Sequence, residues 1–215
     1  MTGQRPVTAV VLAGGRSSRF GDDMKATATL GGTALVERVV EAVRTATGRN
    51  PVVAAGPPEK RAVIDDVLSQ PVRYASDAEW CSGPVAGVCG ALSETSTPTL
   101  FLCGCDMPLL SSRAVSWLLD RHADSDADGT VPLDETGAPQ LLHGVYETAA
   151  LADACNRHPD RHSLRSLVAA LSTDTVSLAA TPDDIPLSQS AMNVNTRSDL
   201  ADARLCVSPD EYVRR

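Results

Sequence analysis

Residues 7–25 read Val-Thr-Ala-Val-Val-Leu-Ala-Gly-Gly-Arg-Ser-Ser-Arg-Phe-Gly-Asp-Asp-Met-Lys, and this stretch predicts how the fold begins. Residues 7–12 form a short β-branched apolar run that glycine ends, which is typical of a buried strand. The loop that follows combines glycines with cations, namely Gly14, Gly15, Gly21, Arg16, Arg19 and Lys25. Glycines allow positive φ and close backbone approach, so successive N–H groups can surround an anion. We therefore expect a strand that leads into a phosphate-binding loop.

This loop follows neither of the two common phosphate-binding patterns. The Walker A pattern Gly-x-x-x-x-Gly-Lys-Ser/Thr is absent, and so is the dinucleotide pattern Gly-x-Gly-x-x-Gly. From the residues alone, a glycine-rich turn between a strand and a helix stays open as the alternative to phosphate binding.

Along the rest of the chain, stretches with the period of a helix alternate with short apolar stretches typical of strands. Helices are expected over residues 33–46, 58–68, 84–92, 147–157 and 163–171, and two more after the capping residues Ser111 and Thr196. Strands are expected over residues 51–56, 72–75, 99–103, 130–133, 141–145, 176–179 and 192–195. This alternation predicts a three-layer α/β/α fold with a mainly parallel central sheet, whose ligands bind at the carboxyl ends of the strands. No linker or internal repeat divides residues 1–215, so we expect a single domain.

The composition limits which ligands the protein is expected to bind and where in the cell it is expected to lie. A formal net charge of −8 and a pI near 4.9 leave no broad basic face, which argues against nucleic-acid binding. The first apolar run is too short for a signal-peptide core or a membrane span, so a cytoplasmic location without membrane attachment is expected. The six cysteines show no Cys-x-x-Cys spacing, and we expect them to be reduced.

Asp106 is a second candidate functional residue. It follows the apolar strand expected over residues 99–103, and Pro108 prevents that strand from continuing. Its carboxylate is therefore expected at the carboxyl end of the strand, in the binding crevice. A hard oxygen ligand there suits Mg²⁺, which takes one or two protein carboxylates and completes its shell with water and substrate phosphate. From the spacing alone, a capping or turn-forming role for Asp106 stays open.

Four motifs that occur in order along the chain resemble those of a known family. They are Leu12-Ala13-Gly14-Gly15-x-Ser17-x-Arg19-Phe20-Gly21-x-x-x-Lys25, Asp77 followed by Gly83-Pro84-Val85-Ala86-Gly87, Cys105-Asp106-Met107-Pro108, and Asn193-Val194-Asn195-Thr196. Together they resemble the MobA-like nucleotidyltransferases. The resemblance implies a Rossmann-like fold and the transfer of a nucleoside monophosphate from an NTP. Within the family, the combination is most similar to the guanylyltransferases of molybdenum cofactor synthesis.

The resemblance also implies a role for each motif. Nucleotide binding falls to Leu12, Ala13, Gly14, Gly15, Lys25, Asp77, Gly83, Gly87 and Asp106. Lys25 and Arg19 would stabilise the phosphates during catalysis, and Asp106 would bind Mg²⁺ with Asn195, or Asn193, nearby. Asp77 and the 83–87 loop would recognise base and ribose, since a carboxylate can accept hydrogen bonds from guanine N1 and N2. An ordinary loop and helix start at Pro84 explains the same spacing.

The implied reaction moves GMP from GTP to the phosphate of molybdenum-molybdopterin and releases pyrophosphate. It needs no protein nucleophile, because the acceptor phosphate is already ionised at neutral pH. The implied cofactor is Mg²⁺. The implied partners are GTP, the molybdenum-molybdopterin acceptor and molybdoenzyme maturation proteins.

Three positions depart from the family pattern. Met24 stands where relatives have aspartate, Ala54-Ala55-Gly56 lacks the asparagine that tends to follow the second strand, and Gly104 stands where proline is common. A cytidylyl-, cobinamide-phosphate or sugar-phosphate nucleotidyltransferase therefore stays open. So does a nucleotide-binding homologue without turnover.

Overall fold

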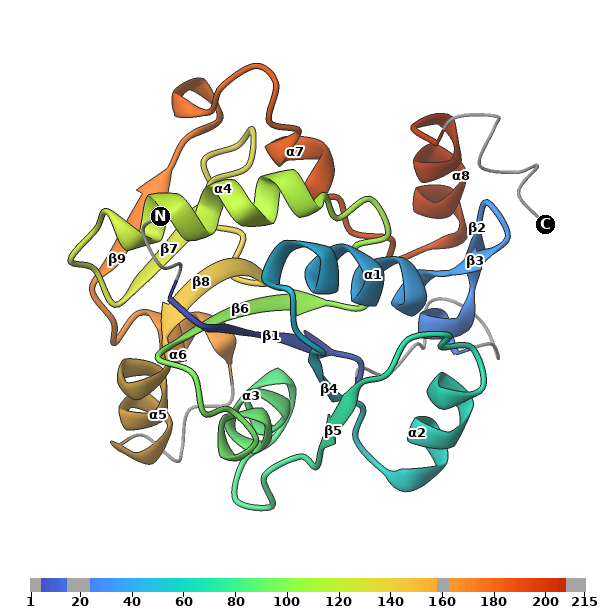
Figure 1. Ribbon diagram of the computed structural model, residues 1–215, viewed down its shortest axis with the longest axis horizontal. Coiled ribbons are helices and arrows are strands. Elements are labelled where there is room, and N and C mark those ends of the chain that lie inside the picture. The colour runs from blue at the N-terminus through green and yellow to red at the C-terminus, as the bar shows by residue number, and fades with distance from the viewer. Residues whose placement is uncertain (1–4, 15–23, 158–162, 208–215) are drawn as a thin grey trace.

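The computed structural model describes residues 5–14, 24–157 and 163–207, and its centre is a seven-stranded sheet (Figure 1). The strands lie in the order β5 (Arg73–Ala75), β4 (Val52–Ala54), β1 (Val7–Leu12), β6 (Thr99–Gly104), β8 (His143–Glu147), β7 (Gly129–Pro132) and β9 (Thr173–Val176). β8 is antiparallel to its neighbours β6 and β7, whereas the other adjacent pairs are parallel. The predicted α/β fold with a mainly parallel sheet is confirmed.

Helices cover both faces of this sheet (Figure 1). One face carries α1 (Leu35–Thr47) and α4 (Ser112–Ala123), and the other carries α3 (Pro84–Ser93), α5 (Thr148–Arg157) and α6 (Leu164–Val168). Successive side chains of a strand point to opposite faces. Accordingly, Ala9 and Val11 of β1 join the core under α1 and α4, and Val10 between them joins the core over α3. The layers are therefore α/β/α.

A third apolar core lies beside the sheet and packs the C-terminal helix onto an early hairpin. The remaining elements are the 3-10 helices η1 (Lys25–Thr27) and η2 (Leu178–Ala180), the hairpin β2 (Thr29–Leu30) and β3 (Thr33–Ala34), and the helices α2 (Pro58–Asp65), α7 (Leu187–Ser190) and α8 (Arg197–Leu205). Leu30 of the hairpin and Leu35 of α1 pack with Val194, Leu200 and Ala203. The helix α8 thus lies near the segment that carries Lys25.

Some expected boundaries differ from the structure for local reasons. The helix expected from residue 33 begins at Leu35, because Thr33 and Ala34 pair with β2 across Gly31 and Gly32. Both glycines have positive φ, as a two-residue hairpin turn requires. The helix expected to reach residue 68 ends at Asp65, since the amides of Val67 and Leu68 bond to carbonyls only three residues back.

Two expected late strands are wrong or misplaced. Residues 173–176 form the edge strand β9, and the second half of the expected 176–179 strand, Leu178 and Ala179, belongs instead to the 3-10 helix η2. Residues 192–195 form no strand, because Val194 N donates to Asp106 O at 2.8 Å instead of joining a sheet edge. The expected 141–145 strand starts two residues later, at His143.

Two further properties concern the length of the described helices and the state of the cysteines. Across residues 5–14, 24–157 and 163–207, every helix is too short or too polar to cross a bilayer. All six cysteines are free thiols. Cys81 Sγ and Cys89 Sγ lie 3.8 Å apart, and burial raises the pKa of Cys81 to about 11, so this thiol stays protonated at neutral pH.

Candidate functional site

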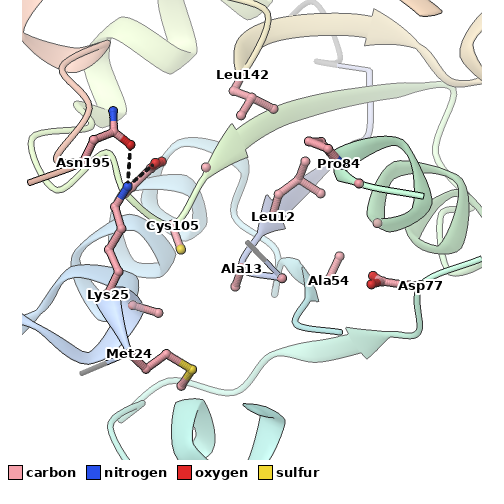
Figure 2. Close-up of a pocket in the computed structure, with 16 residues that line it drawn as sticks. Leu12, Ala13, Met24, Lys25, Ala54, Asp77, Pro84, Cys105, Leu142 and Asn195 are labelled. Carbon is pink, nitrogen blue, oxygen red and sulfur yellow. Dashed lines mark hydrogen bonds and ion pairs between the residues drawn. The ribbon is translucent and has the colours of Figure 1, made fainter. Parts of the chain in front are cut away.

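A cavity of about 650 Å³ opens at the carboxyl ends of β1, β4 and β6 (Figure 2). Because these strands are parallel, the segments that follow them meet at one edge of the sheet, where α/β proteins bind ligands. The lining residues are Leu12, Ala13, Gly14, Met24, Lys25, Ala26, Ala54, Asp77, Gly83, Pro84, Gly87, Gly104, Cys105, Asp106, Leu142 and Asn195. The predicted position of the ligand site agrees with this cavity.

Hydrogen bonds continue past the strand ends and align the loops of this edge. Ala13 N donates to Ala54 O at 2.8 Å, and Cys105 N donates to Leu12 O at 3.0 Å. Lys60 of α2 donates from Nζ to Gly14 O at 2.8 Å. The start of the glycine-rich loop and the Cys105–Asp106 segment are therefore held side by side.

Three polar side chains from distant parts of the chain meet on one side of the cavity (Figure 2). Lys25 Nζ donates to Asp106 Oδ2 at 2.7 Å and to Asn195 Oδ1 at 2.8 Å. The side chains of Lys25 and Asp106 are only 14% and 22% exposed, so water screens this ion pair less than it screens a surface pair. We call these three residues the cation cluster.

Gly104 makes room for the Asp106 carboxylate. A Cβ placed on Gly104 would lie 2.3 Å from Asp106 Oδ1, well inside contact distance. A side chain at this position therefore requires a different Asp106 conformation. The departure at Gly104 thus permits the Asp106 conformation in which Oδ2 reaches Lys25.

Asp77 lies on the other side of the cavity from Lys25 (Figure 2). Three glycines lie near it. A Cβ placed on Gly14, Gly56 or Gly87 would lie 3.8, 3.6 or 3.6 Å from a carboxylate oxygen of Asp77. The missing side chains leave open space around this carboxylate. Within the described residues, nothing hydrogen-bonds to it, so its oxygens are available to donors on a ligand.

Close packing between α3 and the segment after β5 sets the place of Asp77. A Cβ on Gly90 would lie 1.7 Å from Ser76 O, so the two backbones touch where Gly90 has no side chain. Ala78 N donates to Ala86 O at 2.9 Å, which ties the far side of Asp77 to the same helix. Gly83, with φ +63°, precedes Pro84 at the first position of α3, as the sequence predicted for the start of this helix.

The two candidate asparagines differ in what they contact. Asn195 reaches the cation cluster, whereas Asn193 Nδ2 donates to Ala191 O at 3.1 Å and serves a local turn. Asp199 accepts hydrogen bonds from the Asn195 and Thr196 amides at 2.7 and 2.8 Å. The Asn195 N–H holds the pKa of Asp199 below its usual range, and the charge of Lys25 acts in the same direction.

The oxygens of the cation cluster fit Mg²⁺. Asp106 Oδ2 and Asn195 Oδ1 converge on the single position that Lys25 Nζ takes, and both are hard oxygen donors. Within the described residues, no group of three or more His, Cys, Asp or Glu side chains is arranged to hold a metal. The cluster therefore suits an ion that takes few protein ligands and leaves its other positions to water and phosphate.

Cys105 also lines the cavity, but it is not a nucleophile at neutral pH. Burial, and then the nearby Asp106 charge, raises the pKa of Cys105 to about 12. The thiolate is the reactive form of cysteine, and here it is nearly absent. The chemistry of this cavity is that of charges and hydrogen bonds.

The structure brings most of the predicted site residues together. Leu12, Ala13, Gly14, Lys25, Asp77, Gly83, Gly87, Asp106 and Asn195 all line the cavity. Gly15 and Arg19 lie outside the described residues. Leu142, which lines the cavity ahead of β8, was not predicted, because it belongs to no motif. A single leucine before a strand carries no sequence signal for a binding site.

A glycine-lined cavity at parallel strand ends, with a lysine and two carboxylates, places the protein among the α/β proteins that have a ligand site at this edge of the sheet. The family can be stated as well. A profile of the MobA-like NTP transferase domain matches residues 9–176, and the chain belongs to this family. The protein is therefore a MobA-type nucleotidyltransferase, and the resemblance seen in its motifs is confirmed.

Relatives from archaea and bacteria share much of the chain. A probable molybdenum cofactor guanylyltransferase of Natronomonas pharaonis is 34% identical over 149 residues, 69% of this chain and 71% of its own. A molybdenum cofactor guanylyltransferase of Desulfosudis oleivorans is 27% identical over 94% of this chain and 96% of its own. The crystal structure of molybdopterin-guanine dinucleotide biosynthesis protein A from Archaeoglobus fulgidus has the same fold. Its TM-score is 0.77 at 20% identity, with 93% of this chain and 97% of that chain covered.

Proposed function

We propose that this protein transfers GMP from GTP to the terminal phosphate of molybdopterin that carries molybdenum. The products are pyrophosphate and the guanine dinucleotide form of the cofactor. The observation that carries the proposal is the cation cluster on the edge of a glycine-lined cavity. The names of the Natronomonas and Desulfosudis relatives support the choice of base and acceptor.

In this proposal the two sides of the cavity have different tasks. The Asp77 carboxylate accepts hydrogen bonds from guanine N1 and N2 or from the ribose hydroxyls, since its oxygens face open space between glycines. Glycine walls let the flat base approach the backbone closely. The triphosphate then extends past Gly14 towards Lys25 on the other side of the cavity.

The transfer step needs charge stabilisation and alignment. An oxygen of the acceptor phosphate attacks the α-phosphorus, the bond from that phosphorus to the bridging oxygen breaks, and pyrophosphate leaves. Lys25 donates hydrogen bonds to the phosphates as negative charge moves onto the leaving group, and Arg19 is proposed to assist it. The attacking oxygen is already ionised, so no protein base has to remove a proton.

Asp106 and Asn195 are the residues that would hold Mg²⁺ in this proposal. When bound, Mg²⁺ neutralises charge on the phosphates and orients them. Lys25 then exchanges its carboxylate partner for phosphate oxygens, which lie within reach of its flexible side chain. The lysine thereby keeps the carboxylate and amide oxygens in place until the ligands arrive.

Nucleotide binding tests the proposal directly. Calorimetry compares GTP, CTP and ATP, each with and without Mg²⁺, for the wild type and Asp106→Ala. We expect GTP to bind most tightly, and binding to weaken without Mg²⁺ or without Asp106. Asn193→Ala is the matched control, because Asn193 lies in the same motif as Asn195 but bonds only to a local carbonyl among the described residues.

A pyrophosphate-release assay with the acceptor then distinguishes the alternatives. Mg²⁺-dependent release with GTP supports the guanylyltransferase. Tighter binding and turnover of CTP would instead show a cytidylyltransferase, which the segment Ala54-Ala55-Gly56 at the end of β4 leaves open. Nucleotide binding without turnover would show a non-catalytic homologue, and no binding at all would contradict the proposal.

A further inference from the structure

We propose that Asp199 is a positioning residue for the cation cluster, in addition to capping α8. The proposal rests on the proposed function for its consequence in nucleotide binding, but its structural part can be tested without any nucleotide. Asp199 does not line the cavity itself. It acts through the backbone of Asn195, whose side chain accepts a hydrogen bond from Lys25.

The hydrogen bonds of Asp199 exceed those of an ordinary capping box. In a capping box, the third residue of a helix accepts from the N-cap amide, and the N-cap side chain accepts in return. Both bonds are present, from Thr196 N to Asp199 Oδ2 at 2.8 Å and from Asp199 N to Thr196 Oγ1 at 3.1 Å. Asp199 Oδ2 also accepts from Asn195 N at 2.7 Å, one residue before the cap. This extra bond is directed at the residue that enters the cavity.

The backbone before Asn195 is fixed from the other side. Val194 is fully buried in the core between the β2–β3 hairpin and α8, and its N–H donates to Asp106 O at 2.8 Å. The chain is thus held at Val194 by Asp106 and at Asn195 by Asp199. Both members of the cluster that bond to Lys25 are therefore tied to one short backbone segment.

Asn195 needs this support because packing does not hold it. Asn195 itself is exposed, although the preceding Val194 is buried. An exposed side chain keeps its rotamer freedom unless hydrogen bonds restrain it or its backbone. The Asp199 bond restrains the Asn195 backbone, and so the amide oxygen stays within 2.8 Å of Lys25 Nζ.

A purely structural role for Asp199, as a helix cap, makes a different prediction. Thr196→Ala removes the hydroxyl that accepts from the Asp199 amide. It keeps the two backbone amides, of residues 195 and 196, that donate to the Asp199 carboxylate. Asp199→Ala removes the acceptor for Asn195 as well. If capping were the whole role, the two variants would affect the cluster in proportion to their losses in Tm. Asp199→Asn keeps an acceptor oxygen at the same place, so this variant is expected to hold Asn195 almost as well as the wild type does.

The two lysines of the chain provide a readout that needs no ligand. Brief acetylation with acetic anhydride, followed by mass spectrometry, gives the ratio of modification at Lys25 to that at Lys60. Lys60 donates to Gly14 O from α2 and serves as the internal reference. Losing the Asn195 bond removes one of the hydrogen bonds that hold Lys25 Nζ, so we expect Asn195→Ala and Asp199→Ala to raise the ratio about fivefold. Thr196→Ala and Asp199→Asn are expected to stay within about twofold of the wild type.

Three outcomes would overturn the proposal. Asp199→Ala could leave the ratio at the wild-type value while Asn195→Ala raises it. Thr196→Ala could raise it as much as Asp199→Ala, which would assign the effect to the helix cap. Asn195→Ala could leave it unchanged, which would remove the premise that Asn195 restrains Lys25. A Tm for each variant confirms that the folded protein is being modified.

The same variants measured by calorimetry connect this role to the proposed function. With Mg²⁺ present, Asp199→Ala is expected to raise the Kd for GTP about fivefold, and Thr196→Ala less than about twofold. Wild-type protein that binds no nucleotide would contradict the proposed function and leave the acetylation result to decide the role of Asp199. Wild-type binding with an unaltered Kd in Asp199→Ala would contradict the positioning role alone.

Discussion

The two carboxylates that face the cavity, Asp106 and Asp77, differ in how the protein treats them. Asp106 is mostly buried, pairs with Lys25, and has its backbone carbonyl bonded to Val194. Asp77 is exposed, lies near glycines, and forms no hydrogen bond with the described residues. The Asp106 carboxylate is thus fixed by its ion pair, whereas the Asp77 carboxylate is open to water.

This difference teaches which task each side can perform. Stabilising charge that develops during a reaction requires groups already fixed in place. Recognising a base requires acceptors whose hydrogen bonds are exchanged from water to the ligand, so an open carboxylate loses little when the ligand arrives. We therefore expect changes at Asp106 to lower turnover and changes at Asp77 to weaken nucleotide binding.

The largest effect is expected for Asp106→Asn, which removes the charge and keeps the shape. Turnover in the pyrophosphate-release assay should fall about a thousandfold, since a fixed charge is lost beside the reacting phosphates. Tm should change little, because the amide oxygen of asparagine can still accept the hydrogen bond from Lys25 Nζ. Turnover within tenfold of the wild type would remove Asp106 from the catalytic residues.

Gly90→Ala disturbs the packing between α3 and the backbone next to Asp77. The new Cβ would lie 1.7 Å from Ser76 O, and a backbone atom cannot move aside without shifting α3. We expect a loss of about 3 kcal/mol in the free energy of unfolding, measured by urea titration. Gly87→Ala is the control, since its closest contact is the flexible end of Leu12 at 3.2 Å. Equal stability of the two variants would contradict the contact.

Gly104→Ala makes the corresponding change on the Asp106 side, where the obstacle is a side chain. Its Cβ would meet Asp106 Oδ1 at 2.3 Å, and the carboxylate can rotate away. Stability should therefore change much less than in Gly90→Ala. Turnover should fall about a hundredfold, because misplacing a catalytic group by an ångström costs that much. A stable variant with unchanged turnover would show that the Asp106 conformation is not needed.

Asp77→Ala should raise the Kd for GTP about thirtyfold, as expected for losing hydrogen bonds to a charged acceptor. Turnover at saturating GTP should stay close to the wild-type value. Calorimetry with GTP and inosine triphosphate, which lacks the guanine amino group, tests whether the base is the partner. If both nucleotides lose affinity equally, Asp77 bonds to the ribose or to guanine N1, and unchanged affinity for both would contradict a role in binding.

A buried histidine limits the pH range in which the two carboxylates can be compared. Complete burial lowers the pKa of His143 from 6.5 to about 3, so His143 is neutral in the folded protein and takes up a proton on unfolding below pH 6.5. Its contribution to stability is present above that pH and is lost as the pH falls towards 3. Between pH 7 and pH 5.5 we expect a loss of about 1 kcal/mol.

Urea titrations of the wild type and His143→Gln at these two pH values measure this contribution. Glutamine can replace the hydrogen bond with Ser190 Oγ but does not titrate, so the loss between the two pH values should shrink. An equal loss in both proteins would assign the pH dependence to other groups.

Local patterns predicted the elements that depend on local chemistry. β1 has the expected bounds, since its apolar run is ended by glycine, and Ser111 caps α4 by accepting from Ala114 N. Residues 192–195 show where such patterns end. Their alternation is typical of a strand, yet Val194 bonds to the loop after β6, a partner far away in sequence. Which backbone a segment pairs with is decided by the whole fold.

In the candidate site, too, local motifs predicted some features, and others depend on the whole fold. Lys25, Asp77, Asp106 and Asn195 were found because each belongs to a motif with a chemical purpose. The roles of Gly104 and Gly90 could not be found, since they depend on which atom lies opposite a missing side chain. The hydrogen bond from Asn195 N to Asp199 could not be predicted either, because a capping pattern does not reveal an additional partner.

The antiparallel position of β8 in the seven-stranded sheet has a consequence for how the cavity can change. β8 presents its beginning to the cavity, so Leu142 is positioned by the connection from β7, and Tyr146 anchors that connection through its hydroxyl on Leu141 O at 2.8 Å. Insertions or deletions in residues 133–142 would remodel one wall while β1, β4 and β6 keep the opposite one unchanged. The shape of the cavity can thus change on that side without any change in the strands that lead into the glycine-rich loop and Asp106.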